Sequence, residues 1–267
     1  MEEKKKKSFN VLGTSIWRIL AYFIIYSFVG FLIETIFALV FYNVLESRQS
    51  FLYGPFCGIY GVGAVVMYVI LNKYFKKNKH LLFLGGFLVG SVVEYVLSFL
   101  GEILLNVRWW DYSNRFLNIN GRICLVYSIF WGLLGLYLVK IANPIIDKFL
   151  DKIKDKIGIV KARTMAIVLT IFLFINCVVS GVAIDLFLTR VAIENNLEVA
   201  YKEEIQEKYN KIYIKNDKLS SFIHRHWGNE KMIKTYPNLT IGLANGESKK
   251  VKEFYPDIQY YYVKIEK

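Results

Sequence analysis

Several features that mark other classes of protein are scarce or missing in this sequence. It contains only 4 prolines, which excludes a collagen-like or a proline-rich disordered chain. Its 3 cysteines are an odd number without a close pair, so neither a disulfide framework nor a zinc site is expected. The pattern Gly-x4-Gly-Lys-Ser/Thr, which binds nucleotide phosphates, does not occur. We therefore expect no metal, no cofactor and no enzyme active site in this chain.

Apolar residues, by contrast, are abundant and gather in long runs. The chain is 55% hydrophobic, whereas soluble domains average about 45–50%. Five runs reach the length of about 20 residues that a membrane crossing needs. They are residues 17–42, 56–75, 81–105, 123–142 and 164–189. The sequence therefore predicts an all-α polytopic membrane protein with about five transmembrane helices.

The positive charge is distributed unevenly between these runs. The net charge is +12, and the loops after the second and fourth runs are rich in lysine. The loops after the first and third runs carry few basic residues: Arg48 in one, and Arg108, Arg115 and Arg122 in the other. Because cytoplasmic loops carry the excess of Lys and Arg, this asymmetry predicts that residues 1–16 are cytoplasmic and the C-terminus extracytoplasmic. A bilayer, rather than nucleic acid, then accounts for the charge.

A lysine-rich stretch at residues 145–161 has a different pattern. Its apolar residues recur at helical spacing, with Asp and Lys between them. This pattern predicts a short helix lying on the inner membrane surface. Docking of a partner protein is the alternative.

The C-terminal region, residues 190–267, is much more polar than the runs before it. Residues 194–211 are charged and typical of a helix, while 239–244 and 260–265 have strand-like composition. Asn245-Gly246 supplies a turn signal between the two strand-like pieces. We expect a small extracytoplasmic α+β appendage.

The third run carries charge inside the predicted membrane region. A charged side chain costs roughly 2.5–3.5 kcal/mol at the middle of a span, so such residues face protein or water and are functional hypotheses by default. At helical spacing, Glu94, Ser98 and Glu102 share one face of this run, and valines and leucines occupy the other. Glu34 in the first run and Asp185 in the fifth are further intramembrane acids.

The polar loop 106–122 follows the third run and is dense in aromatic and charged residues. Its arginines can fold inward and pair with Glu102 or Asp185. A structural use is the alternative, with the tryptophans as an interfacial aromatic belt and the arginines as packing contacts. The candidate substrate-path or ligand-binding residues are Glu34, Glu94, Ser98, Glu102, Arg108, Trp109, Trp110, Asp111, Tyr112, Asn120, Arg122 and Asp185.

Several motifs in order along the chain resemble one family. They are residues 30–35 (GFLIET), 51–64 (FLYGPFCGIYGVGA), 94–98 (EYVLS), 108–113 (RWWDYS) and 117–125 (LNINGRICL). Together they resemble the ABC-transporter permease family of CmpB type, over roughly residues 15–190. The resemblance implies a multi-spanning protein of the bacterial plasma membrane that acts as a transporter permease.

Three functions follow from these features. The first is transport of a small substrate, for which an anion is the candidate because of the arginines; a dry, filled face on the third run would count against it. The second is an extracytoplasmic enzyme acting on lipid or envelope precursors, with Glu102, Asp111 or Asp185 as acid or base. The third is a non-catalytic scaffold or sensor. The expected partners are the lipid bilayer, a separate ATPase subunit and a second copy of the chain, with no nucleic acid.

Overall fold

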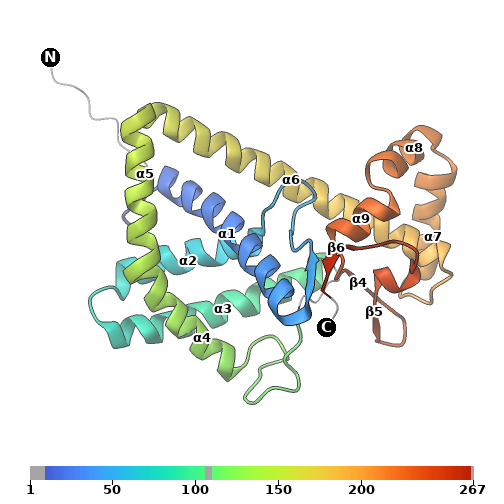
Figure 1. Ribbon diagram of the computed structural model, residues 1–267. Helices are drawn as coiled ribbons and strands as arrows, with labels where there is room; N and C mark the ends of the chain where they lie inside the picture. The colour runs from blue at the N-terminus through green and yellow to red at the C-terminus, as the bar shows by residue number, and fades with distance from the viewer. Residues whose placement is uncertain (1–9, 106–109, 266–267) are drawn as a thin grey trace. The chain divides into compact units, whose positions relative to one another are not determined.

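The computed structural model describes residues 10–105 and 110–265. These residues are mostly helical and form two compact units, each of which is described by itself (Figure 1). The first unit comprises Met1–Val29, Gly58–Gly101 and Arg108–Leu173. The second unit comprises Gly30–Cys57, Glu102–Val107 and Phe174–Lys267.

Among the residues that the structure describes, four helical segments are long and apolar enough to cross a bilayer. They are Ile16–Tyr42 (α1), Lys79–Ile103 in α3 (Lys79–Leu105), Leu125–Ile157, and Ile159–Glu194 (α6). The fifth apolar helix, α2 (Gly58–Tyr74), has 17 residues. The chain is therefore a multi-pass membrane protein with four candidate spans. Four of the five predicted crossings are confirmed as helices of sufficient length, and the crossing by α2 stays a prediction.

The second predicted span, residues 56–75, agrees with α2 to within two residues at its start. Residues 50–57, ahead of α2, have no helical structure. Gly54 has φ +83°, a left-handed conformation, and Pro55 follows it. Because the residue before a proline disfavours the helical region, these two residues delay the helix to Gly58.

Close helix contacts through glycine organise the first unit. The core gathers aromatic and aliphatic side chains from α1, α2, α3 and the turn Leu138–Ala142 that follows α4 (Leu125–Tyr137), including Tyr22, Met67, Leu82 and Leu138. Gly61 of α2 lies against Ser27 and the backbone of Phe23 in α1. Small residues let membrane helices approach closely, and here they bring α2 onto α1.

Gly61→Ala is expected to destabilise the protein by about 1–3 kcal/mol, the usual range for overpacking a well-packed core. The added Cβ would lie 2.6 Å from the Phe23 carbonyl oxygen, which belongs to helix backbone and cannot rotate away. The measurement is the thermal unfolding midpoint of the detergent-purified protein. The matched control is Gly63→Ala on the same helix, where the nearest atom, in Val93, lies 3.9 Å from the new Cβ. Equal midpoints for the two variants would contradict this account of the contact.

The lysine-rich stretch predicted as a separate surface helix is continuous with the fourth span. A π-helical turn, η1 (Leu138–Ala142), joins α4 directly to α5 (Asn143–Ile157). Pro144 explains the irregular turn, because its ring would clash with the carbonyl of Lys140 in a regular α-helix. The helical run changes direction between α4 and α5 (Figure 1). Gly158, with φ +83°, then ends α5, and α6 begins at Ile159.

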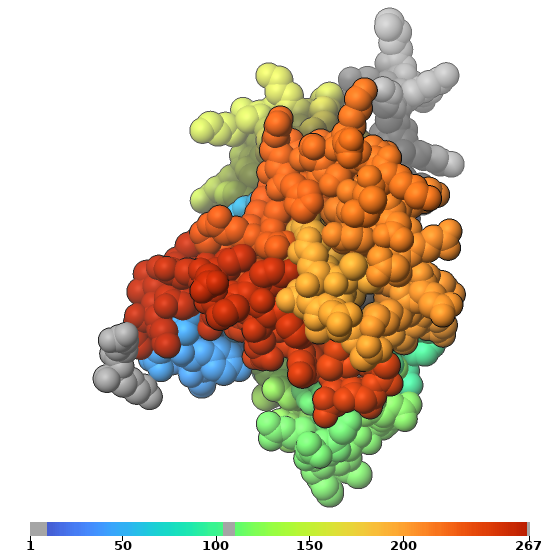
Figure 2. Space-filling view, turned by 90° about the vertical axis from the view of Figure 1, so that its right-hand side faces the viewer, coloured from blue at the N-terminus to red at the C-terminus, as the bar shows by residue number. Residues whose placement is uncertain are grey.

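The second unit joins the C-terminal tail to the loop that follows α1. Its core combines Leu52 from that loop, Phe187 and Val191 from α6, and Met232 and Ile241 from the tail. Strand β3 (Val44–Glu46) pairs antiparallel with β6 (Tyr261–Lys264), near the end of the chain. In Figure 2 the last residues of α6, in gold, lie between the orange helices and the red segments of the tail.

The tail contains short helices and strands, as its composition indicated. The helical elements are α7 (Lys202–Tyr209), η2 (Asn210–Ile214), α8 (Asp217–His226), α9 (Asn229–Thr235) and η3 (Val251–Phe254). The two strand-like pieces do not pair with each other. Instead β4 (Thr240–Gly242) turns through Asn245-Gly246 to pair with β5 (Ser248–Lys250), while β6 pairs with β3. Near the N-terminus, β1 (Asn10–Val11) and β2 (Thr14–Ser15) form a short hairpin.

Candidate functional site

A buried carboxylate lies at the centre of the candidate site in the first unit. Glu94 of α3 is only 5% exposed. Its Oε1 accepts a hydrogen bond from the Tyr112 hydroxyl at 3.1 Å, and its Oε2 accepts one from Trp131 Nε1 at 2.9 Å. The two donors come from different elements, the loop 110–124 and α4. Glu94 therefore ties both of them to α3 through neutral donors.

A glycine on α3 makes room for the tryptophan donor. Gly90 lies one helical turn before Glu94, and a Cβ added at this position would collide with the Trp131 side chain. Gly86, a further turn back, similarly faces the backbone of Trp131 and Gly132. The indole therefore packs against bare backbone and places its N–H beside the carboxylate. Tryptophan N–H groups usually need such a partner when they are buried.

The rest of the polar face of α3 is also in contact with α4 and the loop. The hydroxyls of Ser91 and Ser128, on α3 and α4, lie 2.7 Å apart. Ser98, which is 1% exposed, accepts a hydrogen bond from Arg122 Nη1 at 3.2 Å. Val92, on the opposite side of α3, is 61% exposed, as expected for a side chain that faces lipid. The polar and apolar sides of α3 thus have different surroundings.

Arg122 lies against aromatic rings of α3. Its guanidinium carbon is 5.8 Å from the ring centre of Tyr95 and 5.5 Å from that of Phe99. A cation over such rings gains roughly 0.5–2 kcal/mol, more when it is desolvated. The backbone carbonyl of Arg122 in turn accepts a hydrogen bond from Trp110 Nε1 at 2.9 Å. One residue of the loop is therefore held by both its side chain and its backbone.

The loop 110–124 has a defined internal structure. Asp111 Oδ1 accepts hydrogen bonds from the backbone N–H and the hydroxyl of Ser113, at 2.9 and 2.6 Å. The Tyr112 N–H donates to the Gly121 carbonyl at 2.8 Å, and Gly121 has φ +65°. Asn120 Nδ2 donates to the hydroxyl of Tyr95 on α3 at 2.8 Å. These bonds fold the loop back over the end of α3.

Tyr112 connects this loop to the buried carboxylate. Its ring stacks on Tyr127 of α4, with ring centres 4.6 Å apart and planes 20° from parallel. Burial raises the pKa of the Tyr112 hydroxyl above its ordinary value of 10.0, and the nearby Glu94 carboxylate raises it further. The hydroxyl is therefore protonated at neutral pH and available as the donor to Glu94.

The residues proposed from the sequence divide between the two units. Those in the first unit lie around the end of α3, and they are Glu94, Ser98, Trp110, Asp111, Tyr112, Asn120 and Arg122. Those in the second unit are Glu34, Glu102 and Asp185. Arg108 and Trp109 lie outside the described residues.

Asp185 forms an ion pair with Lys208 of α7 in the second unit, and its pairing with an arginine of the loop 106–122 stays a prediction. Both side chains are substantially exposed, so the pair contributes about 0–1 kcal/mol. The contact joins α6 to α7 within the second unit and points to a structural role for Asp185.

Three residues of the site were not identified from the sequence. Trp131, Tyr127 and Tyr95 all lie inside apolar runs, where aromatic residues ordinarily pack or face lipid. Each makes a polar or stacking contact with the site. The usable signal was Gly90 one turn before Glu94, which indicates a bulky side chain from a neighbouring helix at that level.

In this structure the polar face of α3 is covered. Tyr112 and Trp131 occupy the positions beside the two oxygens of Glu94. A molecule that reached Glu94 would have to displace the Tyr112 hydroxyl first. Within residues 10–105 and 110–265 there is also no group of three His, Cys, Asp or Glu side chains placed to hold a metal ion. The arrangement is that of a closed polar site, and this filled face of α3 counts against an open transport path in this conformation.

Comparison with known proteins identifies a family. Residues 21–181 match the model of the family described as "Putative ABC-transporter type IV". This segment covers more than half of the chain and includes α2 to α5, the loop 110–124 and most of α1 and α6. Neither the curated proteins nor the solved structures that were compared gave a match.

Proposed function

The chain belongs to the putative ABC-transporter type IV family, and from this we propose that it is the permease subunit of an ABC transporter in a bacterial plasma membrane. The observation that carries the proposal is the polar face of α3, closed by the loop 110–124 through Glu94. Burying a carboxylate in a membrane helix is costly, so such residues commonly mark a path or a switch. A role in transport would account for the buried carboxylate of Glu94.

The orientation that we propose follows from the basic loops. Lys76 and Lys140 lie together, since Lys140 Nζ donates to the Lys76 carbonyl at 3.0 Å. This lysine-rich end is assigned to the cytoplasm. The loop 110–124 at the other end of α3 and α4 then faces outward. At about 1.5 Å per residue the 17 residues of α2 extend about 26 Å, close to the 30 Å hydrocarbon thickness, which supports a fifth crossing and an extracytoplasmic tail.

In this proposal the loop 110–124 is a gate on the extracytoplasmic side. Arg122, held over Tyr95 and Phe99, binds a small anionic substrate. Glu94 keeps the gate closed, because it holds Tyr112 and with it the loop. Substrate bound at Arg122 would compete with the contact to Ser98 and loosen the loop. Release of Tyr112 would then uncover the polar face of α3.

The energy for transport would come from a second protein. ABC transporters hydrolyse ATP on a subunit or domain with a phosphate-binding loop, and the sequence lacks that pattern. We therefore propose a separate ATPase subunit as the partner. This chain would contribute the membrane path and no catalytic group.

The proposal predicts an ATPase that associates in a fixed ratio and responds to anions. The full-length protein, purified in mild detergent from its native membranes, should retain an ATPase with a phosphate-binding loop. In nanodiscs, ATP hydrolysis by this complex should rise at least twofold with a small anionic compound from the growth medium. Arg122→Gln should raise the concentration needed for half-maximal stimulation about tenfold, as expected for the loss of a charged contact worth roughly 1–2 kcal/mol.

The control for this experiment is Arg115→Gln, since Arg115 is an exposed arginine of the same loop. This variant should respond to anions like the unmodified protein. If the folded protein retains no ATPase after chemical cross-linking in membranes, the assignment as a permease subunit is wrong. If an ATPase is retained but both arginine variants respond normally, only the role of Arg122 is wrong.

A further inference from the structure

The helix α5 carries its charges in two separate stripes. Its sequence repeats Asp-Lys every four residues, at 147–148, 151–152 and 155–156. Because a helix turns about 100° per residue, the aspartates line one face and the lysines line the neighbouring face. The two stripes therefore meet different surroundings.

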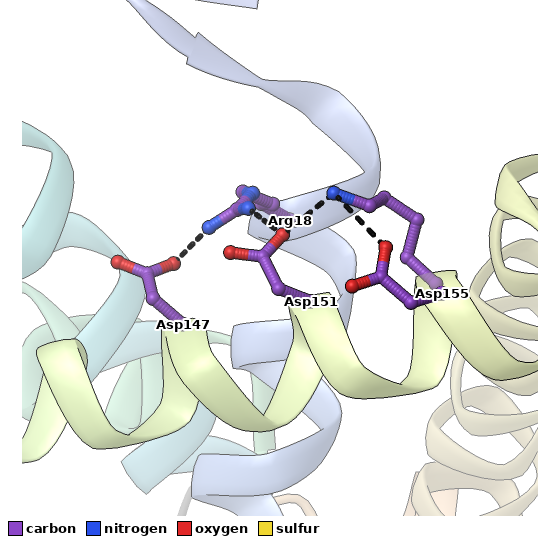
Figure 3. A network of polar contacts seen from close by, with 5 residues as sticks. Arg18, Asp147, Asp151 and Asp155 are labelled. Atoms are coloured by element: carbon purple, nitrogen blue, oxygen red, sulfur yellow. Dashed lines mark hydrogen bonds and ion pairs between the residues drawn. The ribbon is translucent and has the colours of Figure 1, made fainter.

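Two of the three aspartates pair with the start of α1, while the third, Asp155, lies 3.7 Å from Lys154 of α5 itself. Arg18 reaches across from α1 to form ion pairs with Asp147 and Asp151, the second with a separation of 2.7 Å (Figure 3). Beside these pairs, the buried side chain of Leu150 packs against Trp17. Asp147, Asp151 and Leu150 thus contact α1, whereas Asp155 pairs within α5.

The neighbouring face of α5, which carries the lysines, has exposed apolar residues as well. Ile145 is 62% exposed and Phe149 is 54% exposed. Lys148, Lys152 and Lys156 are also exposed, and all five residues fall within an arc of about 100° on the helix. Two large apolar side chains thus lie among three lysines on one solvent-facing strip, which we call the outer face of α5.

The place of α5 along the chain brings this outer face close to the membrane surface. The helical run from Leu125 to Ala142 extends about 27 Å, nearly the thickness of the hydrocarbon core. Lys148 lies six residues beyond Ala142, about 9 Å further along the helix. Because the run changes direction at η1, α5 crosses the start of α1 rather than extending the line of α4 (Figure 1). Lys152 and Lys156 therefore stay near the membrane surface.

We propose that the outer face of α5 binds the phosphate groups of anionic phospholipids. The three lysines contact headgroup phosphates, while Ile145 and Phe149 enter the boundary between headgroups and acyl chains. An acidic protein surface would also suit the lysines. The lipid is favoured because α5 continues directly from a membrane span and because its apolar pair requires an apolar neighbour at the same depth. This inference depends neither on the direction of transport nor on an ATPase.

The experiment measures lipid affinity with the full-length protein. Detergent-purified protein is titrated with phosphatidylglycerol or with phosphatidylcholine, and native mass spectrometry reports the bound fraction. The unmodified protein should prefer phosphatidylglycerol. The triple variant K148Q/K152Q/K156Q should bind it roughly 100-fold more weakly, at about fivefold per lysine. Its affinity for phosphatidylcholine should be unchanged.

A matched control separates this face from charge in general. K211Q/K215Q/K218Q removes three exposed lysines of the tail and should leave the affinity for phosphatidylglycerol unchanged. An equal effect of the two triple variants, or no preference for phosphatidylglycerol in the unmodified protein, would overturn the proposal. It would also fail if inorganic phosphate displaced the lipid at equal concentration, since the site would then be one for free phosphate.

Discussion

Glu94→Ala is expected to lower the stability of the protein by about 2–4 kcal/mol and to release the loop 110–124. The substitution leaves the Tyr112 hydroxyl and the Trp131 N–H, both held by Glu94, without an acceptor. A buried donor without a partner costs about 1–3 kcal/mol, although hydrogen bonds between membrane helices average nearer 0.6. The cavity left by the side chain adds to this cost.

Two measurements check this expectation. The thermal unfolding midpoint in detergent reports stability, and trypsin cleavage after the exposed Arg115 reports release of the loop. Tyr112→Phe removes one of the two hydrogen bonds and should show faster cleavage with a smaller loss of stability. Glu94→Gln keeps one acceptor oxygen and should fall between the two. A Glu94→Ala protein with normal cleavage and a normal midpoint would show that the loop is held by other contacts.

Arg190→Ala should destabilise the second unit by about 3–5 kcal/mol. Arg190 of α6 is fully buried, and its Nη2 donates to the Trp227 carbonyl at 2.9 Å. Its guanidinium carbon also lies 5.3 Å from the ring centre of Phe187 and 5.8 Å from that of Tyr213. The substitution leaves a cavity between α6 and the tail and removes the donor to Trp227. Hydrogen exchange should accelerate in α8 and α9 before it does in α3.

Arg190→Met tests whether the volume of the Arg190 side chain or its polar contacts stabilise the second unit. In the part of the chain that the structure describes, Nε and Nη1 of Arg190 are buried without a hydrogen-bond partner. Because the cost of burying the charge is then only partly repaid, an apolar side chain of similar length should restore most of the stability lost in Arg190→Ala. If Arg190→Met is as unstable as Arg190→Ala, the contacts of the guanidinium outweigh its volume, and this account is wrong.

The environment of Glu94 shows what helical periodicity can and cannot predict. Counting along one helix placed Glu94 and Ser98 together on the polar side of α3, because that step needs only the helical repeat. The donors come from elsewhere in the chain. Trp131 reaches Glu94 because α3 and α4 approach through glycines, and this depends on the packing of two helices rather than on either sequence alone.

In the tail, too, local elements could be predicted, but contacts between distant parts of the sequence could not. Its strand-like pieces were visible in the sequence because β propensity and turn residues are local signals. The sequence did not show which strand pairs with β6. Its partner β3 is a three-residue strand in the loop after α1, more than 200 residues away. The start of α2 at Gly58 lies within two residues of the predicted span, because Gly54-Pro55, which excludes a helix just before it, is a local signal.

The pairing of β3 with β6 has a consequence for how the protein is made. β3 is synthesised soon after the first predicted span, whereas β6 follows more than 200 residues later. At about 5–20 residues per second, β3 waits roughly 10–40 seconds for its partner. During that time its edge is open to other strands. A chain cut before Tyr261 lacks β6 and leaves the edge of β3 unpaired by it.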